Sequence, residues 1–289
     1  MRNTCTLTCF LLLTSFALAA VDPVAFKAAV EFYSQHKPAE AQQAFEALAA
    51  SNPDNADVQF YLGRLALQRN DHEKAVVYLE QAVALSPNDA RMQLKLGDAY
   101  GISAQKAGLF SQMGLARKCK AAYERAVELD PSNIEARFSL MGYYQQAPAI
   151  VGGGTDKAMV QALEIKKLDP ARGRMAIAGV YVADKKFDEA FAEFDSALKD
   201  KPDDYAALFQ TGRLAALSGQ RLDRGLEALR RCLTMTPPEG QPPLAAAHWR
   251  IGNILEKKGD LPGARAAYEA SLQADPKFTY AIESLKKLN

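Results

Sequence analysis

The residue types that carry most enzyme chemistry are sparse in this chain of 289 residues. Its three histidines are His36, His72 and His248, and none stands at a metal-ligand spacing from another histidine or a cysteine. The sequence contains neither a Gly-x-Ser-x-Gly nucleophile elbow nor a His-Glu-x-x-His zinc motif. We therefore expect no catalytic residue, no metal site and no cofactor, and we interpret the histidines as surface or partly packed side chains.

One glycine-rich segment has the composition of a phosphate-binding loop. Residues 151–158 read Val-Gly-Gly-Gly-Thr-Asp-Lys-Ala, and glycines before a helix start can bind an anion through backbone N–H groups. The segment lacks the spacing of a Gly-x-x-x-x-Gly-Lys-Ser/Thr motif, and no strand is predicted before it. We expect a structural loop in which Thr155 or Asp156 caps the following helix, with an anion site as the alternative.

Two series of landmarks recur along the chain and indicate the elements that hold these residues. A small residue is followed after twelve positions by a proline, seven times out of seven. The small residues are Ala41, Ala75, Cys119, Ala158, Ala190, Gly225 and Ala264, and the prolines are Pro53, Pro87, Pro131, Pro170, Pro202, Pro237 and Pro276. Four residues after each small residue stand Phe45, Leu79, Tyr123, Ala162, Phe194, Leu229 and Tyr268, on the same helical face. The pattern predicts seven helices, each ended by a proline that cannot continue the backbone hydrogen bonding.

A second series lies upstream of each of these helices and predicts a first helix in every repeat. Its members, which we call the first-helix small residues, are Ala29, Gly63, Gly97, Gly142, Ala178, Gly212 and Gly252. Small residues at this place let two helices cross closely. Repeats one, four and six depart most, through Ala29, Ala162 and Gly225.

This pattern resembles the tetratricopeptide repeat family, most clearly in residues 62–89 and 251–276. The resemblance covers about 22–276 and implies an all-α solenoid in a right-handed superhelix. The expected repeats span 22–55, 56–89, 90–133, 134–170, 171–204, 205–240 and 245–276, within a solenoid of residues 20–276. Residues 277–289 carry an apolar stripe of Phe278, Ile282, Leu285 and Leu288, which predicts a capping helix over the last open face.

In this family the first helix of each repeat lines a concave groove. We expect two series to face it: the residues three before the first-helix small residues and those one after them. The first series is Phe26, Phe60, Leu94, Ser139, Met175, Phe209 and Trp249, and the second is Val30, Arg64, Asp98, Tyr143, Gly179, Arg213 and Asn253. Aromatic, methionine and arginine side chains are typical of binding hot spots, although the first series also suits packing alone. The lysine and asparagine clamp that some family members use for a terminal carboxylate is missing, because Arg64 and Arg213 are isolated in the sequence.

Two insertions lengthen neighbouring repeats. Ten extra residues lie within 100–119 and four within 145–158, at the turns between first and second helices. Insertions in solenoids often serve binding. Two arrangements are open. The insertions either pack on each other and bury their apolar side chains, or expose them as an apolar patch on one edge. These side chains are Leu109, Phe110, Met113, Pro148, Ile150 and Val151. The pair of insertions resembles a subgroup of exported bacterial repeat proteins.

The first nineteen residues predict a secretory signal peptide. Arg2 precedes an apolar run from Phe10 to Leu18, and Ala17-Leu18-Ala19 has the small-x-small pattern of a cleavage site. The run is shorter than the roughly 20 residues that cross a membrane, although an uncleaved anchor is the alternative. We expect a periplasmic or secreted protein that begins near Ala20, with no membrane span after cleavage.

Cleavage leaves two cysteines, Cys119 and Cys232, which fall on inward positions three repeats apart. Helices pack about 8–10 Å apart, so the cysteines lie too far apart for a disulfide, which needs Cα atoms within about 7 Å. We expect buried free thiols.

Charge identifies no partner. The chain has 35 basic and 34 acidic residues in a mixed order, without the basic block of a nucleic-acid footprint. The sequence therefore favours a non-catalytic scaffold that binds a protein or peptide, in the groove or at the insertions of repeats three and four. The alternatives are a small-ligand or enzymatic role for the 100–119 and 145–158 loops, and a self-assembling structural component.

Overall fold

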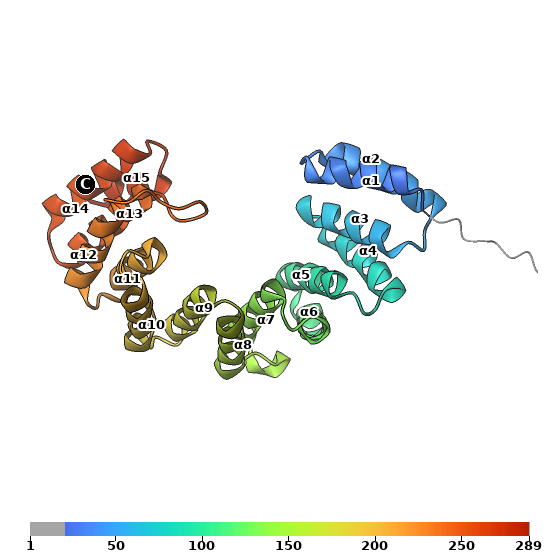
Figure 1. The fold of residues 1–289 in the computed structure, drawn as a ribbon, viewed down its shortest axis with the longest axis horizontal. Helices are drawn as coiled ribbons and strands as arrows, with labels where there is room; N and C mark the ends of the chain where they lie inside the picture. Colours follow the sequence, from blue (N-terminus) through green and yellow to red (C-terminus); the bar gives the residue numbers. More distant parts are fainter. Residues whose placement is uncertain (1–20, 289) are drawn as a thin grey trace, which may run out of the picture. The chain divides into compact units, whose positions relative to one another are not determined.

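The computed structural model describes residues 21–288 of the chain, and this part is built of α-helices with no strand. The helices are α1 (Pro23–Ser34), α2 (Pro38–Ser51), α3 (Ala56–Gln68), α4 (His72–Leu85), α5 (Ala90–Lys106), α6 (Leu109–Leu129), α7 (Ile134–Gln146), α8 (Thr155–Leu168), α9 (Pro170–Ala183), α10 (Phe187–Asp200), α11 (Tyr205–Ser218), α12 (Leu222–Cys232), α13 (Leu244–Lys257), α14 (Leu261–Ala274) and α15 (Thr279–Leu288), with a short 3-10 helix η1 (Ala149–Val151). Figure 1 shows them in order along the chain. The expected fold class, an all-α solenoid of helix pairs, is confirmed.

The helices form two compact units, Met1–Leu129 and Asp130–Asn289. In each unit a first helix packs against its second helix, as α3 does on α4 and α11 on α12. First helices of consecutive repeats also touch within a unit: α3 contacts α5, α7 contacts α9, and α11 contacts α13. The first helices of each unit therefore lie next to one another and present a shared face.

Side-chain caps and prolines set the helix boundaries. Asp71, Asp89 and Asp204 accept hydrogen bonds from backbone N–H groups at the starts of α4, α5 and α11. Most landmark prolines follow the end of a second helix, as predicted. Pro170 is an exception, because it is the first residue of α9 and only Asp169 separates α9 from α8. Proline suits this place, where its missing N–H has no partner within the helix.

The first-helix small residues are required by the large side chains of the second helices. A Cβ added at Gly63 would lie 2.5 Å from Leu79 Cγ, and one at Gly212 would lie 2.2 Å from Leu229 Cγ. At Gly97 and Gly252 the added atom would meet the rings of Tyr123 and Tyr268 at 2.4 and 2.3 Å. Carbon atoms normally pack about 3.5–4.0 Å apart, so these four glycines are what lets each helix pair approach closely.

Repeat four solves the same crossing differently. At Gly142 the nearest atom to an added Cβ is Gln146 Nε2, 3.9 Å away. The second helix of this repeat carries the small, fully buried Ala162 where other repeats carry Leu, Phe or Tyr. In the other repeats a small residue on the first helix makes room for a large side chain on the second helix. Repeat four has the small residue Gly142 but no large side chain opposite it.

The two insertions fold in ways that the sequence did not predict. The insertion within 100–119 is not a loop, because α5 extends to Lys106 and α6 begins at Leu109, so only two residues join two lengthened helices. In the 145–158 segment, Gly154 rather than Thr155 or Asp156 occupies the N-cap position of α8. Gly154 has φ 156° and Gly152 has φ 95°, backbone conformations that favour glycine. The glycines thus serve the chain reversal after η1.

The ends of the core agree with the sequence-based expectations. Cys119 and Cys232 are free and buried, one in each unit, which confirms that they do not pair. The helix α15 packs on α14 and joins a small apolar cluster with Trp249, Leu285 and Leu288. Among residues 21–288 no helix combines the length and apolarity that crossing a membrane requires. The predicted signal peptide, residues 1–19, lies outside the described residues.

Candidate binding groove

Each unit has a hollow on the face made by its first helices, and the same repeat positions line both. They are the residue two before and the residue one after the first-helix small residue, which we call the groove pair. In α5 the pair is Lys95 and Asp98, and in α11 it is Gln210 and Arg213. The two members are three residues apart, hence neighbours on one helix face, and both pairs are hydrogen bonded, at 2.9 Å in α5 and 3.0 Å in α11. In α13 the corresponding pair is Arg250 and Asn253, and Arg250 Nη1 donates to Asn253 Oδ1 at 3.4 Å.

The hollow of the N-terminal unit is polar and has a volume of about 490 Å³. Arg64 of α3 lies over the ring of Tyr33 of α1, with 4.5 Å between the guanidinium carbon and the ring centroid. Gln68 donates a hydrogen bond to the Tyr33 hydroxyl at 3.0 Å. The hollow is also lined by Lys95, Asp98, Ile102 and Gln105 of α5. These groups offer hydrogen-bond donors and a stacked guanidinium to a bound segment.

A tyrosine of the second helix holds the base of this hollow. Tyr123 lies across Gly97 and donates a hydrogen bond from its hydroxyl to Asp98 Oδ1 at 2.9 Å. Burial, followed by the charge of Asp98, raises the pKa of the Tyr123 hydroxyl, which therefore remains a donor. In repeat seven the direction is reversed, because Asn253 Nδ2 donates to the Tyr268 hydroxyl at 2.9 Å. The close crossing at the glycine thus fixes one member of the groove pair.

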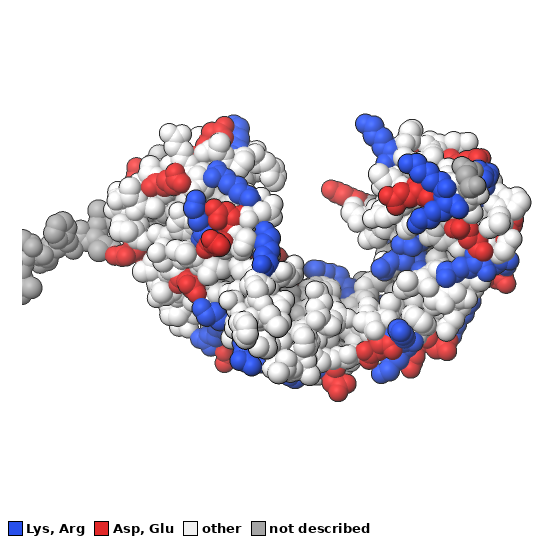
Figure 2. Space-filling view, turned by 180° about the vertical axis from the view of Figure 1, so that it is seen from behind, with Lys and Arg blue, Asp and Glu red and all other residues white. Residues whose placement is uncertain are grey.

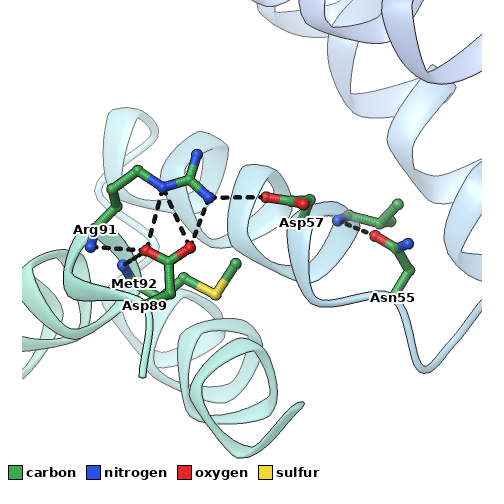
Figure 3. A network of polar contacts seen from close by, with 6 residues as sticks. Asn55, Asp57, Asp89, Arg91 and Met92 are labelled. Atoms are coloured by element: carbon green, nitrogen blue, oxygen red, sulfur yellow. Dashed lines mark hydrogen bonds and ion pairs between the residues drawn. The ribbon is translucent and has the colours of Figure 1, made fainter. Parts of the chain in front are cut away.

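Arg91 joins repeats two and three at the start of the first helices (Figure 3). It donates to both carboxylate oxygens of Asp89 and reaches Asp57 of the preceding repeat at 3.3 Å. The side-chain hydrogen bonds from Arg91 lower the pKa of Asp89, which also accepts from the backbone N–H of Arg91 and Met92. Arg91 is 60% exposed, so this contact contributes modestly to stability, while it orients α3 and α5 at the edge of the face.

The hollow of the C-terminal unit is smaller, and more of the residues that line it are of apolar type. It has a volume of about 200 Å³ and is lined by Met175, Gly179 and Val182 of α9, by Leu214, Leu217 and the groove pair of α11, and by Phe194. Leu217 is 54% exposed, an apolar side chain open to solvent beside the exposed Arg213. Arg250 of α13 lies 4.0 Å over the ring of Trp249. Apolar surface beside guanidinium groups is typical of binding sites for peptides and proteins.

Three residues that the sequence placed in the groove are buried instead. Phe60, Leu94 and Phe209 are only 3–4% exposed. In these three repeats the residue three before the small residue is turned into the helix packing: Phe209 lies in the core cluster of the C-terminal unit, stacked on Tyr205 with 6.5 Å between ring centroids. The expectation that these side chains are accessible in the hollow is therefore wrong.

Two further predicted residues have structural contacts. Trp249 donates from Nε1 to Ser284 Oγ of α15 at 3.0 Å and stacks on Tyr280 at 4.9 Å. Tyr143 donates its hydroxyl to the carbonyl of Val151 at 2.8 Å and so holds the turn that contains η1. Arg64, Met175 and Arg213 line the hollows, and their role in partner binding stays a prediction.

The groove residues that sequence reasoning missed are Lys95, Gln210 and Arg250. All three stand two residues before a first-helix small residue, and Lys27 of α1 holds the same position. This recurrence of polar side chains was the available signal.

The insertion residues are exposed but belong to different units. Leu109 is 71%, Phe110 93% and Met113 37% exposed in the N-terminal unit. In the C-terminal unit Ile150 is 71% exposed, whereas Val151 is 5% exposed and packed. One patch made by both insertions stays a prediction. The segment 100–119 is formed by the end of α5 and the start of α6 rather than by an open loop, and its Ile102 and Gln105 line the N-terminal hollow.

The three histidines of the described residues lie in different repeats. The part of the chain that the structure describes contains no group of three or more His, Cys, Asp or Glu side chains placed to hold a metal. His36 lies in the turn after α1 with φ 56°, His72 begins α4, and burial lowers the pKa of His248. Basic and acidic side chains alternate over the face of each unit in Figure 2, in keeping with the net charge of +1.

The repeat pattern extends to known proteins. A sequence model of the tetratricopeptide repeat matches residues 26–90, 63–100, 175–240 and 214–277, and a second model of this repeat matches 100–133. The chain belongs to the tetratricopeptide repeat family. Proteins of this family generally act as protein-interaction scaffolds.

Solved structures share the fold at low sequence identity. A tetratricopeptide repeat protein from Parabacteroides merdae has a TM-score of 0.64 and 14% identity, covering 92% of this chain and 97% of that one. The C-terminal part of a repeat protein from Cytophaga hutchinsonii has a TM-score of 0.58 and 17% identity, covering 90% and 99%. These likenesses show the fold alone.

Curated relatives are longer proteins. Human protein O-mannosyl-transferase TMTC1 is 26% identical over 232 residues, which are 79% of this chain and 24% of that protein. Cellulose synthase operon protein C of Pseudomonas fluorescens (strain SBW25) is 28% identical over 149 residues, 50% of this chain and 12% of that protein. The chain thus spans about a quarter or less of the length of these relatives.

Proposed function

We propose that this tetratricopeptide repeat protein is a non-catalytic scaffold of the cell envelope that binds a segment of a partner protein along its first helices. The observation that carries the proposal is the pair of hollows lined by groove pairs. Their side chains are fixed by local contacts, such as those from Lys95 and Tyr123 to Asp98, and binding to a preorganised surface costs less entropy.

The shape of the hollows favours an extended or helical segment over a small molecule. The N-terminal hollow, at about 490 Å³, has the volume of a small-ligand pocket but is open to solvent, and the C-terminal one, at about 200 Å³, is below the roughly 300–1,000 Å³ of such pockets. Side chains of a peptide that lies across several first helices fit such shallow, repeated depressions.

Photo-crosslinking in intact cells tests the groove. p-Benzoylphenylalanine replaces Gln105 of α5 and Gln210 of α11, both of which line hollows. The matched controls are the exposed Gln81 of α4 and Glu227 of α12, on second helices. We expect discrete adducts from the two groove positions and few from the controls. Equal adduct patterns from all four positions would contradict groove binding.

The envelope location rests on residues 1–19 of the sequence and has its own test. Mass spectrometry of the protein purified from its source should find a mature N-terminus near Ala20, and fractionation should recover the protein outside the cytoplasm. An intact Met1 terminus in the cytoplasmic fraction would reject this part of the proposal and leave groove binding standing.

A further inference from the structure

Two arginines of the C-terminal unit lie on neighbouring first helices, without a carboxylate partner among the described residues. Arg213 belongs to the groove pair of α11 and Arg250 to that of α13, and the two helices touch. Burial lowers the pKa of Arg250 to about 10, and the charge of Arg213 contributes to that shift. Two like charges near each other, one of them half-buried, raise the electrostatic energy of the empty groove.

The hydrogen bonds of both arginines go to neutral amides. Arg213 donates to Gln210 Oε1 at 3.0 Å and Arg250 donates to Asn253 Oδ1 at 3.4 Å. Within residues 21–288 neither arginine forms an ion pair with a carboxylate. The sequence suggested that Arg213 is isolated. In the structure its helix instead contacts the helix that carries Arg250, a second arginine without a carboxylate partner.

Other arginines of the same unit do have acidic partners. Arg174 pairs with Asp200 of the same repeat at 2.6 Å. Three others pair with the preceding repeat: Arg221 with Asp188 at 2.7 Å, Arg231 with Asp203 at 2.7 Å, and Arg224 with Asp195. These four arginines connect helices through carboxylates, whereas the two groove arginines have no carboxylate partner among the described residues. Charge complementarity then calls for an anion from outside the chain.

The surface beside Arg213 limits what carries that anion. The hollow of about 200 Å³ is walled by Met175, Val182 and Leu217, so it suits one aliphatic side chain better than a whole small molecule. A guanidinium binds a carboxylate through two parallel hydrogen bonds. An acidic residue followed closely by an aliphatic residue satisfies both features.

We propose that Arg213 and Arg250 together bind a side-chain carboxylate within a partner segment, and that a neighbouring aliphatic side chain of that segment enters the hollow next to Arg213. This inference rests on the proposed function, because it names the chemistry of the partner that the C-terminal groove recognises.

A random peptide library displayed on phage tests the specificity of the mature chain. Each peptide is fused through its C-terminus, so that its only carboxylates are those of side chains. We expect the selected peptides to be enriched in Asp or Glu next to Leu, Ile, Val or Met. The double variant Arg213→Gln/Arg250→Gln should bind them about ten- to hundredfold more weakly, the loss expected for a charge-assisted hydrogen-bonded contact.

Two controls separate this inference from a general loss of structure or of the groove. Arg230→Gln removes an exposed arginine of α12 and should bind as wild type does. The double variant should melt at or above the wild-type temperature, because it removes a repulsion and no ion pair. Gly179 lines the hollow and an added Cβ there would meet nothing within 4 Å, so Gly179→Trp should fill the hollow and abolish binding.

The outcomes are distinguishable. Selected peptides without acidic residues, bound equally by the arginine double variant but lost with Gly179→Trp, would overturn the acidic specificity and retain groove binding. Peptides whose binding ignores both changes would overturn the inference and weigh against the proposed function as well.

Discussion

Gly212→Ala should destabilise the C-terminal unit although alanine is the better helix former. The added Cβ would lie 2.2 Å from Leu229 Cγ and 2.6 and 2.7 Å from its two methyl carbons. Normal contact is about 3.5–4.0 Å, so Leu229 must retreat by more than about 1 Å. Leu229 is fully buried, which leaves the helices to separate instead.

The magnitude follows from two opposing effects. Overpacking a core costs about 1–3 kcal/mol, and three short contacts place this site at the upper end. Replacing glycine by alanine within a helix stabilises it by about 1 kcal/mol. We expect a net loss of about 2 kcal/mol in the free energy of unfolding for Gly212→Ala.

Gly142→Ala is the matched control, since its Cβ would meet only Gln146 Nε2 at 3.9 Å. It should stabilise the protein by about 0.5–1 kcal/mol. In a Leu229→Ala background, which copies the small Ala162 of repeat four, Gly212→Ala should also become stabilising. The expected coupling energy of about 3 kcal/mol is at the top of the range for residues in contact.

Urea denaturation followed by far-UV circular dichroism measures the free energies of unfolding. Hydrogen exchange should show faster exchange in α11 and α12 for Gly212→Ala. The reasoning about close crossings is refuted if Gly212→Ala and Gly142→Ala change stability equally, or if the Leu229→Ala background leaves the effect of Gly212→Ala unchanged.

Three further predictions use other contacts. Burial raises the pKa of Cys119 and of Cys232 to about 12, so iodoacetamide at pH 8 should label these thiols only after denaturation. The unfolded thiols ionise near pH 9, whereas the folded ones stay protonated, so their contribution to stability is complete below that pH. As the pH rises from 9 toward 12, each thiol should lower the free energy of unfolding by about 1.4 kcal/mol per pH unit. A flat alkaline stability profile would contradict this prediction. Trp249→Ala should cost about 2 kcal/mol or more and speed hydrogen exchange in α15, since the indole bonds Ser284 and stacks on Tyr280, and unchanged exchange there would show that α15 is held by other contacts. Asp89→Ala should cost about 1 kcal/mol through loss of the cap of α5, more than Arg91→Ala, whose ion pairs are largely exposed; the reverse order in urea denaturation would refute the assignment.

The helix pairs were predictable from sequence because proline and small residues act locally. Pro53 and Pro87 mark helix ends whatever packs around them, and Gly63 and Gly97 mark crossings because large residues stand at a constant distance downstream. The ten extra residues of repeat three were misread as a loop. Their sequence is compatible with longer helices, and length alone does not distinguish a loop from extra helical turns.

The face of the groove was harder to predict. Positions three and two residues before a small residue differ by one step of about 100° around the helix, and both are close to the position one after it. The aromatic residues Phe60 and Phe209 favoured the first choice, yet aromatic side chains are what a close helix packing also buries. The polar residues Lys95 and Arg250 at the second position carried the correct signal.

Repeat seven shows why contacts between repeats escape such patterns. The sequence near Arg250 does not indicate that its helix contacts the helix of Arg213 in the preceding repeat. It also does not indicate that both arginines lack a carboxylate partner. That relation depends on how two helices pack, and only the three-dimensional arrangement supplies it.

Cysteine footprinting tests the central claim, that a partner lies along the groove pairs, most directly. Single cysteines replace Gln210, Phe209 and Arg230 in the mature chain, whose Cys119 and Cys232 are buried. Reactivity toward a maleimide is measured before and after addition of the partner recovered by crosslinking. The account predicts a reactive Cys at 210 that the partner protects, an unreactive one at 209, and a reactive one at 230 that stays reactive; protection at 230 with none at 210 would contradict it.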